Sequence, residues 1–505
     1  MQKIYELSEL KDITKDLKRK TKVVGLCHGV FDLLHLGHIH YLEEAKSICD
    51  YLIVTITDDE FVNKGPGRPY FNSSERSKAL SSLECVDFVG INRSKTALNL
   101  LKTIKPSIYI KGPDYKNAKD DPTDNLKKEI SVIKKSGGEF YVTQGDQYSS
   151  SKILNDFFED DDSINQYRQS LRNKVSSKML KQYFDSLKDI KVLVIGEAIL
   201  DNYVFCETVG KAGKDPFLVS RKKDSFTYLG GSLAGANNIS DFVKDVRVLT
   251  YLGDRDIQLE SIKEKLAQNV KLTYINKKDS PTINKTRFVD QNTNTKINGI
   301  YDINDSNLSR QDEEKFLKKL DKLIKSYDVV IAMDFGHGLF TRNVIKMITK
   351  KSKFLAVNVQ QNSFNSGFYD ISKFSKADLF TLHEGELRQH FRDKVSPVHK
   401  LLIQLDKIVD FKNIILTRGK KGALMKSCSK RKPISSPGLA KKIVDRVGSG
   451  DALLVTSALS IYKDHPDELS LLFGSISAAE IIKDYANSSV LDKADVLNSM
   501  TSFLK

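Results

Sequence analysis

Two histidines with the spacing for phosphate chemistry stand near the start of the chain. His35 and His38 lie three positions apart in GVFDLLHLGH, where an apolar run gives way to a pattern of helical period. At the start of a helix their imidazoles would share one face with its free backbone N–H groups, and Gly37 would let another group approach closely. Such donors can hold a polyanionic phosphate and follow the charge that develops on a leaving group. A pair of histidines that only caps a helix is the weaker interpretation after a strand.

Further candidate phosphate ligands follow in the first third of the chain. Cations that could neutralise a triphosphate are Lys64, Arg68 and Arg76. Lys111 and Asp114 stand in KGPDY, directly after an apolar run, where a ligand-binding loop is expected. The hydroxyls of Ser149, Ser150 and Ser151 open a final helical pattern and could hold phosphate oxygens. The order of these segments behind the two histidines predicts a nucleotide-transfer site.

A second constellation lies near the carboxyl end, where DRVGSGD precedes the helical pattern ALLVTSALSIY. Gly448, Ser449 and Gly450 would expose backbone N–H groups as an anion cradle. Asp451 beside them could accept a proton from an attacking hydroxyl. A glycine-rich turn with an acidic cap is the structural alternative. Because no G-x-x-x-x-G-K-[ST] occurs, a P-loop enzyme is not indicated.

Alternating strand-like and helix-like runs must position both constellations. In the first part the strands are expected at 23–27, 51–57, 86–91, 107–111 and 139–143, with helices at 38–49, 73–83, 96–104 and 123–135. In the second part strands are expected at 192–195, 246–251, 329–333, 354–359, 378–381 and 414–417. The pattern predicts an α/β fold with two doubly wound domains, in which ligands bind at the carboxyl ends of parallel strands. We expect a domain at 1–155, a helical or partly flexible connector at 156–190, and a domain at 191–495.

Composition limits the classes of partner and compartment. The 80 basic and 65 acidic residues give a net charge of +15, but the lysines are scattered, so no nucleic-acid partner is expected. The five cysteines form no C-x-x-C pair and are expected to be reduced. No apolar run approaches the roughly 18 residues of a membrane span, and the first residues are too charged for a signal peptide. We therefore expect a cytoplasmic protein with no membrane contact.

The first domain resembles a known family through four motifs, GVFDLLHLGH, GRPYFNSSERSKALSSLECVDFV, KGPDY and YSSSKIL. They are similar to the cytidylyltransferase-like nucleotidyltransferases of Rossmann-like fold, nearest the adenylyltransferase domain of bifunctional heptose-phosphate kinase/adenylyltransferases (ADP-heptose synthases). The resemblance implies that His35 and His38 stabilise the transition state at the α-phosphate. It places Asp32 beside the sugar phosphate or nucleotide. It further implies phosphate or nucleotide contacts for Gly29, Phe31, Arg76, Ser150 and Ser151.

The second domain resembles the ribokinase-like (PfkB) carbohydrate kinases over residues 190–490. The motifs are GEAILD, GGSLAGANN, DFGHG, TRGKKG and DRVGSGD. The resemblance implies that Asp451 is the catalytic base and that 448–450 form the anion hole. The residues implied to bind sugar are Asp201, Gly230, Gly231 and Asn238. Those implied to lie near ATP are Thr417, Gly419, Gly422 and Glu386.

Three positions depart from the kinase pattern. Ala234 and His383 stand where asparagine is usual, and Gln360 stands in place of the lysine of an Asp-Pro-Lys stretch. The order of the two domains is also the reverse of that in the heptose enzymes. These departures leave the sugar and nucleotide contacts open.

Together the motifs predict a bifunctional enzyme of nucleotide-sugar synthesis that uses ATP and Mg²⁺, with ADP-heptose as the leading product. No protein ligand set for the metal is assigned. The expected partners are a sugar phosphate and a nucleoside triphosphate, with a homo-oligomer implied by the resemblance alone. One alternative gives the transferase CTP and another sugar or polyol phosphate. Another makes the kinase-like domain a non-catalytic binding or dimerisation module.

Overall fold

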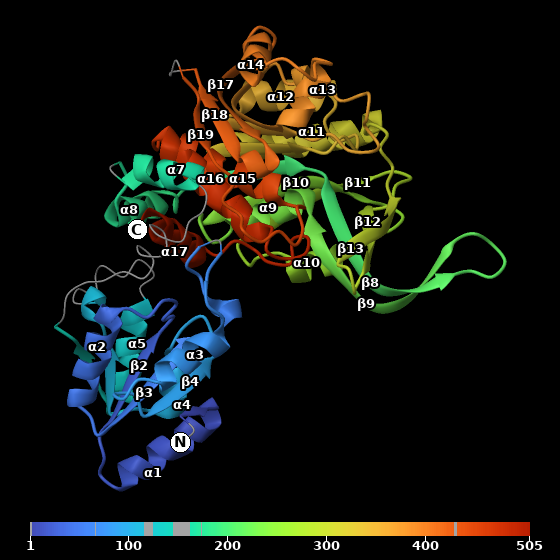
Figure 1. The fold of residues 1–505 in the computed structure, drawn as a ribbon. Helices are drawn as coiled ribbons and strands as arrows, with labels where there is room; N and C mark the ends of the chain where they lie inside the picture. The colour runs from blue at the N-terminus through green and yellow to red at the C-terminus, as the bar shows by residue number, and fades with distance from the viewer. Residues whose placement is uncertain (1–2, 66, 116–124, 145–161, 173, 429–431) are drawn as a thin grey trace. The chain divides into compact units, whose positions relative to one another are not determined.

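The computed structural model describes residues 3–65, 67–115, 125–144, 162–172, 174–428 and 432–505 (Figure 1). The chain divides into two compact units, residues 1–181 with 494–505 and residues 182–493. Ser149, Ser150 and Ser151 lie outside the described residues. Among the helices that are described, none combines the length and apolar character needed to cross a membrane.

The first unit contains the predicted parallel sheet, with strand order β1-β4-β3-β2-β5-β6. Its strands are β1 (Ile4–Tyr5), β2 (Val24–Gly29), β3 (Tyr51–Thr57), β4 (Phe88–Asn92), β5 (Ile108–Lys111) and β6 (Glu139–Val142). Its helices are α1 (Leu7–Arg19), α2 (Leu36–Ser47), α3 (Ser73–Ser81), α4 (Leu98–Ile104), α5 (Asn125–Lys135), α7 (Asp162–Arg172) and α17 (Lys493–Leu504), and α8 (Ser177–Ser186) spans the boundary between the units. β1 and α1 were not predicted, because their sequence is polar and charged.

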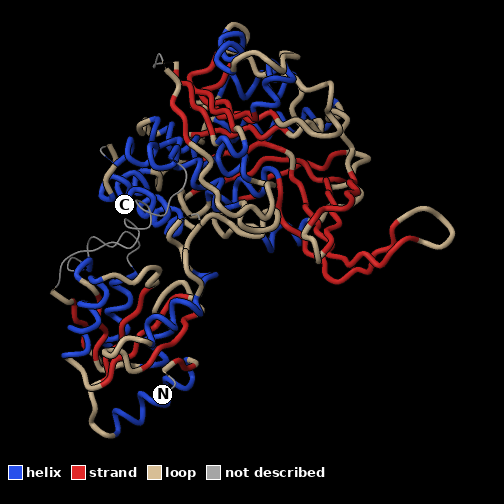
Figure 2. Tube along the Cα trace, viewed as in Figure 1, coloured by secondary structure: helices blue, strands red, loops and turns tan. Residues whose placement is uncertain are grey.

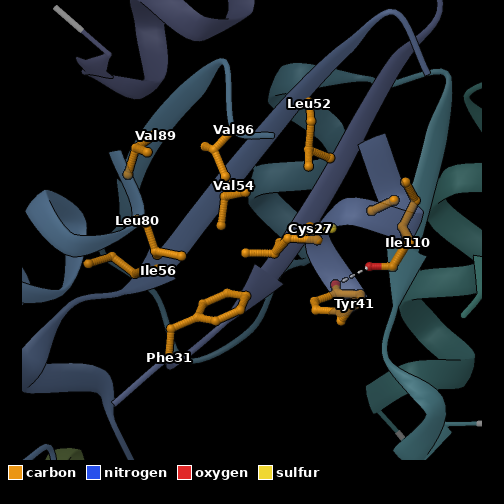
Figure 3. Close-up of a cluster of buried hydrophobic side chains, with 12 residues drawn as sticks. Cys27, Phe31, Tyr41, Leu52, Val54, Ile56, Leu80, Val86, Val89 and Ile110 are labelled. Atoms are coloured by element: carbon orange, nitrogen blue, oxygen red, sulfur yellow. Dashed lines mark hydrogen bonds between the residues drawn. The ribbon is translucent and has the colours of Figure 1, made fainter. Parts of the chain in front are cut away.

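Apolar side chains on one face of this sheet fix the turn that carries the histidines. Phe31 packs among strand residues such as Val54 and Ile56 (Figure 3). From α2, the Tyr41 hydroxyl donates a hydrogen bond to the Ile110 carbonyl at 2.9 Å. Tyr41 also stacks on Phe31, with ring centroids 6.4 Å apart. The packing of Phe31 after β2 and the hydrogen bond from Tyr41 to β5 therefore fix the start of α2 against the sheet.

The second unit is built on a nine-stranded sheet of order β11-β10-β7-β14-β15-β16-β17-β18-β19. Its strands are β7 (Lys191–Gly196), β10 (Asp245–Gly253), β11 (Val270–Lys277), β14 (Val329–Asp334), β15 (Leu355–Val359), β16 (Lys376–His383), β17 (Asp410–Thr417), β18 (Ala423–Ser427) and β19 (Ile434–Ser436). Its helices are α9 (Gly231–Ile239), α10 (Leu259–Lys265), α11 (Arg310–Ile324), α12 (Arg342–Lys351), α13 (Glu384–His390), α14 (Val398–Asp406), α15 (Ser449–Tyr462) and α16 (Asp467–Ile481). All neighbouring strands from β11 to β17 are parallel, which confirms the predicted doubly wound architecture.

A separate four-stranded sheet, which the sequence did not predict, has the order β13-β12-β8-β9. Its strands are β8 (Ala198–Lys211), β9 (Leu218–Gly230), β12 (Ile283–Asp290) and β13 (Thr295–Asp302). We call it the small sheet. The β8–β9 hairpin extends beyond the other two strands (Figures 1 and 2). Most side chains of β9 and β13 are exposed, so these strands lack the apolar run of a buried strand.

Candidate active sites

The turn between β2 and α2 brings the two histidines together. His35 is the extended N-cap of α2, and its ring centroid lies 4.0 Å from that of His38 with the planes 24° apart. Phe31, whose φ is +50°, places its ring centroid 5.2 Å from that of His38. The imidazoles thus form a stacked pair beside the first N–H groups of the helix, where a phosphate can be bound.

Burial and nearby positive groups make His38 a neutral donor in the free protein. Burial first, and then the charges of His35 and Lys64, lower the pKa of His38 to about 3. Because a triphosphate brings negative charge, its binding would oppose this shift and favour a proton on the ring. The charge of Lys64 therefore acts on His38 electrostatically.

Asp32 holds a loop against the histidine turn. Its carboxylate accepts hydrogen bonds from the backbone N–H groups of Tyr70 at 2.7 Å and Phe71 at 3.1 Å. It also pairs with the Arg68 guanidinium at 3.3 Å, and its side chain is only 2% exposed. These contacts tie the GRPYF segment to the turn, so Asp32 and Arg68 shape the site.

The Arg76 guanidinium is buried and committed to protein acceptors. It donates to the carbonyls of Phe71 at 2.9 Å, Val30 at 2.6 Å and Thr57 at 2.9 Å, and to Asp59 at 2.5 Å. The resemblance implies a phosphate contact for this residue. In the structure its donors join three backbone segments around the histidine turn, and the phosphate contact stays a prediction.

Lys111, at the end of β5, is also largely buried. Its ammonium donates to the His28 carbonyl at 3.2 Å and lies 3.9 Å from Glu129. It also lies over the Tyr115 ring, 4.9 Å from the centroid. The KGPDY loop therefore begins from a fixed cation at the carboxyl end of the sheet, and the backbone of Asp114 follows in a short 3-10 turn.

The kinase constellation lies at the start of α15. Gly448 is the N-cap with a φ of +86°, and a Cβ there would lie 2.0 Å from Oδ1 of Asn487. Only glycine fits this close approach. Asp451 stands in the first helical turn and is 9% exposed. Burial, together with the charges of Asp201 and Glu386, raises its pKa to about 7, and Lys285 acts in the opposite direction.

Asp201 lies on the small sheet and is charge-paired. It forms an ion pair with Arg287 of the neighbouring strand β12. The guanidinium also lies 5.5 Å from the ring centroids of Tyr203 and Tyr301. The charge of Asp201 raises the pKa of Asp451, so the two carboxylates act on one another electrostatically.

Lys285, Arg287 and His337 are site residues that the sequence reasoning did not assign. Lys285 is 9% exposed, and burial lowers its pKa although Asp201 and Asp451 oppose the shift. Within the described part of the chain, Lys285 has no ion pair and the ring nitrogens of His337 have no hydrogen-bond partner. Burial first, and then the charges of Lys285 and Lys277, lower the pKa of His337 to about 3. Lys285 therefore acts on the candidate base Asp451 and also on the buried ring of His337.

The residues expected near ATP form a second group at the ends of β16 and β17. Glu386 accepts hydrogen bonds from the backbone N–H groups of His383 at 2.7 Å and Gln361 at 2.9 Å. The Nδ1 atom of His383 accepts one from Gly385 at 3.0 Å, so histidine here completes a capping box on α13. Gly419 and Gly422 both have positive φ and follow Thr417 in a tight turn.

Asn238 is placed differently from the other residues expected to bind sugar. It is buried in α9, and its side-chain oxygen accepts a hydrogen bond from the Leu491 backbone at 3.3 Å. Ala234 is buried in the same helix. Among the described residues, no group of three or more acidic, histidine or cysteine side chains is arranged to hold a metal ion.

Comparisons with known families match each unit separately. Residues 26–156 match the family described as cytidylyltransferase-like, and residues 189–494 match the pfkB family of carbohydrate kinases. A relative named bifunctional protein HldE, from a Nitratiruptor species, is 40% identical over 132 residues, which are 26% of this chain and 28% of the relative. The HldE of Campylobacter fetus subsp. fetus is 44% identical over 119 residues, 23% of this chain and 25% of the relative. The chain thus matches less than a third of each relative's length.

Solved structures resemble the second unit. Phosphofructokinase-2 from Escherichia coli in complex with substrates and products gives a TM-score of 0.51 at 13% identity, covering 63% of this chain and 100% of that one. The same enzyme in complex with fructose-6-phosphate gives the same TM-score and coverage. At this identity the likeness shows the fold alone.

Proposed function

Because this chain belongs to the pfkB family of carbohydrate kinases and carries a cytidylyltransferase-like domain ahead of the kinase, we propose that it catalyses two separate reactions in the synthesis of a nucleotide sugar, between which a phosphatase would remove the acceptor's other phosphate. The kinase would phosphorylate a sugar phosphate with ATP. The transferase would couple a sugar 1-phosphate to a nucleotide, with ADP-heptose as the leading product. The similarity of the transferase part to bifunctional HldE proteins supports this choice.

The stacked pair of His35 and His38 carries the proposal for the transferase. A sugar-phosphate oxygen would attack the α-phosphorus in line while the bond to the β-phosphate oxygen breaks and pyrophosphate leaves. The two imidazoles and the N–H groups of α2 would stabilise the charge on the transferred and leaving phosphates. Asp32 and Arg76 would act through the loop and turn that they hold together.

Asp451 carries the proposal for the kinase. Its carboxylate would accept the proton of the attacking hydroxyl as the oxygen bonds to the γ-phosphorus and ADP leaves. A pKa of about 7, raised mainly by burial, suits a base that works near neutral pH. The N–H groups of 448–450 would hold the transferred phosphoryl group.

Positive groups near Asp451 support an acceptor that already carries a phosphate. Lys285 and Arg287 project from one strand, and Lys285 lowers the pKa of the buried His337. A dianionic phosphate would provide Lys285 with the ionic partner that the described residues do not supply. A neutral free sugar would leave this nearly buried ammonium unpaired.

Mg²⁺ fits both sites as an ion that arrives with the triphosphate. Mg²⁺ commonly keeps several waters and binds through substrate phosphates with one or two carboxylates, so a dedicated cage of protein ligands is not needed. Glu386, whose charge acts on Asp451, is the carboxylate that we would expect to contact such an ion or its water. When bound, the ion would neutralise charge on the phosphates.

A product screen tests the proposal. The full chain is incubated with Mg²⁺, either ATP or CTP, and either heptose 7-phosphate, heptose 1-phosphate or free heptose, and products are identified by mass spectrometry. We expect a bisphosphate from heptose 7-phosphate and ATP, and ADP-heptose from heptose 1-phosphate. A nucleotide sugar formed from CTP alone would contradict the ATP assignment. Failure to phosphorylate any member of a broad sugar and sugar-phosphate panel would favour a binding module.

A further inference from the structure

The carboxylate of Asp445, which begins the DRVGSGD segment, is a buried junction between three parts of the second unit. Oδ2 accepts hydrogen bonds from the Tyr203 hydroxyl at 2.6 Å and from the Ala486 backbone at 3.2 Å. Oδ1 accepts from the Lys296 ammonium at 2.6 Å and from the Val447 backbone at 3.2 Å. All four donors are satisfied by one side chain that is 6% exposed.

Two of these donors belong to the small sheet. Tyr203 is a fully buried residue of β8, and Lys296 is a 39%-exposed side chain of β13. Asp201, expected to face the sugar, stands two positions before Tyr203 on the same strand. If acceptor binding moved β8, the hydrogen bond from the Tyr203 hydroxyl would therefore move the Asp445 carboxylate as well.

The 485–487 turn strengthens the same connection. The Tyr485 hydroxyl donates to Asn294 at 2.7 Å, in the turn between β12 and β13. Asn487 packs so closely on Gly448 that a Cβ on the glycine would lie 2.0 Å from its Oδ1 atom. Two routes, through Asp445 and through this turn, therefore connect the small sheet with residues 447–448 of the cradle.

We propose that Asp445 is a positioning residue that couples the small sheet to the anion hole of the kinase. Tyr203 and Lys296 hold the Asp445 carboxylate, and Asp445 in turn orients the Val447 backbone ahead of the cradle. This inference rests on the proposed role of 448–450 as the anion hole. Its consequence is that a small sheet displaced from Asp445 leaves ATP bound but the transferred phosphoryl poorly stabilised.

Kinetics of the full chain with ATP and heptose 7-phosphate test this coupling. We expect Tyr203→Phe and Lys296→Met each to lower kcat about tenfold with little change in KM for ATP, and Asp445→Asn to lower it by about 10²-fold. Tyr203→Phe added to Asp445→Asn should cost little more, because both changes remove the same interaction. Lys296→Arg should restore most of the rate. Additive losses, or a rise in KM for ATP alone, would overturn the proposal.

Tyr228→Phe is the matched control. Tyr228 lies on β9 with its ring 5.9 Å from that of Tyr203, and its hydroxyl makes no hydrogen bond to the described residues. The Tyr228→Phe variant should have the same kcat as the wild type. A loss equal to that of Tyr203→Phe would mean that packing, and not the bond to Asp445, sets the rate. Thermal unfolding of each variant checks that it remains folded. Because the Lys296 side chain is exposed, Lys296→Met tests the contact with Asp445 without changing the buried core.

Amide hydrogen exchange of the free protein gives a second readout that needs no acceptor. Tyr203→Phe and Lys296→Met should raise exchange in peptides covering 445–452, whereas Tyr228→Phe should not. Equal exchange in all three variants would overturn the coupling. If the wild type phosphorylates nothing, the proposed kinase reaction fails, while the exchange experiment still decides whether the small sheet orders the cradle.

Discussion

Gly230 and Asp201 lie in such close contact that a Cβ on the glycine would be 2.2 Å from Oδ2 of the carboxylate. The two residues are diagonal neighbours on strands β8 and β9, where Ile199 pairs with Gly230 and Asp201 with Tyr228. The missing side chain of Gly230 thus provides the space that Asp201 occupies beside Arg287.

Gly230→Ala should therefore displace Asp201 and impair acceptor binding by the kinase. We expect kcat/KM for heptose 7-phosphate to fall by at least about 10²-fold, with pyrophosphate release by the transferase unchanged. Gly213→Ala, at a hairpin position with no neighbouring atom within 4 Å of an added Cβ, is the control. Full kinase activity in Gly230→Ala would show that Asp201 does not contact the acceptor.

His38→Ala should disable the transferase while sparing the kinase. Loss of a donor to the phosphates is expected to lower the rate of pyrophosphate release by about 10²-fold or more. His40→Ala removes an exposed histidine from the same helix and should have no effect. Coupled pyrophosphate and ADP assays on one preparation measure both reactions. Equal activity in the two variants would contradict the role of the stacked pair.

The kinase should lose activity as the pH falls through about 7. Burial raises the pKa of Asp451 to about 7, and only the deprotonated carboxylate can accept the hydroxyl proton. Because Lys285 lowers this pKa, Lys285→Met should raise it further and move the acid limb of kcat/KM to higher pH. The transferase profile in the same protein is the internal control. An acid limb that Lys285→Met leaves in place would argue for another base.

Arg76→Lys should destabilise the first unit more than it alters its chemistry. Lysine keeps the charge but cannot reach the four acceptors of the guanidinium, so buried carbonyls lose their donors. We expect a loss of about 2–4 kcal/mol in the free energy of unfolding. Arg93→Lys, at a side chain that is 65% exposed, should cost little. Urea unfolding followed by pulse proteolysis of the first unit measures both variants.

The parallel strands could be predicted because they are buried on both faces. Val192–Ile195 and Val329–Met333 are continuous apolar runs, and their spacing with helical patterns indicated two doubly wound domains. β9 and β13 escaped prediction because their side chains are mostly exposed and polar, so no periodicity marks them. The strands of the small sheet are held largely by pairing with β8. Such pairing joins residues that are far apart in the sequence, so a local pattern does not reveal it.

The sequence indicated those parts of the candidate sites whose residues lie within a few positions of one another. His35 with His38, and Gly448 with Asp451, needed only a strand followed by a helix. Lys285 and Arg287 stand in an ordinary strand sequence, KTRFVD, and only the fold brings Lys285 near Asp451 and Arg287 beside Asp201. The burial of Arg76 depends on three backbone carbonyls from separate segments, and spacing along the chain cannot reveal such partners.

The junction at Asp445 also determines when the kinase can first become competent during synthesis. Its partners come from positions 203, 296, 447 and 486, so the junction cannot close until residue 486 has left the ribosome. The first unit's sheet, by contrast, is complete by residue 142. A nascent chain halted before residue 486 would therefore carry the strands of the kinase without an ordered phosphate cradle.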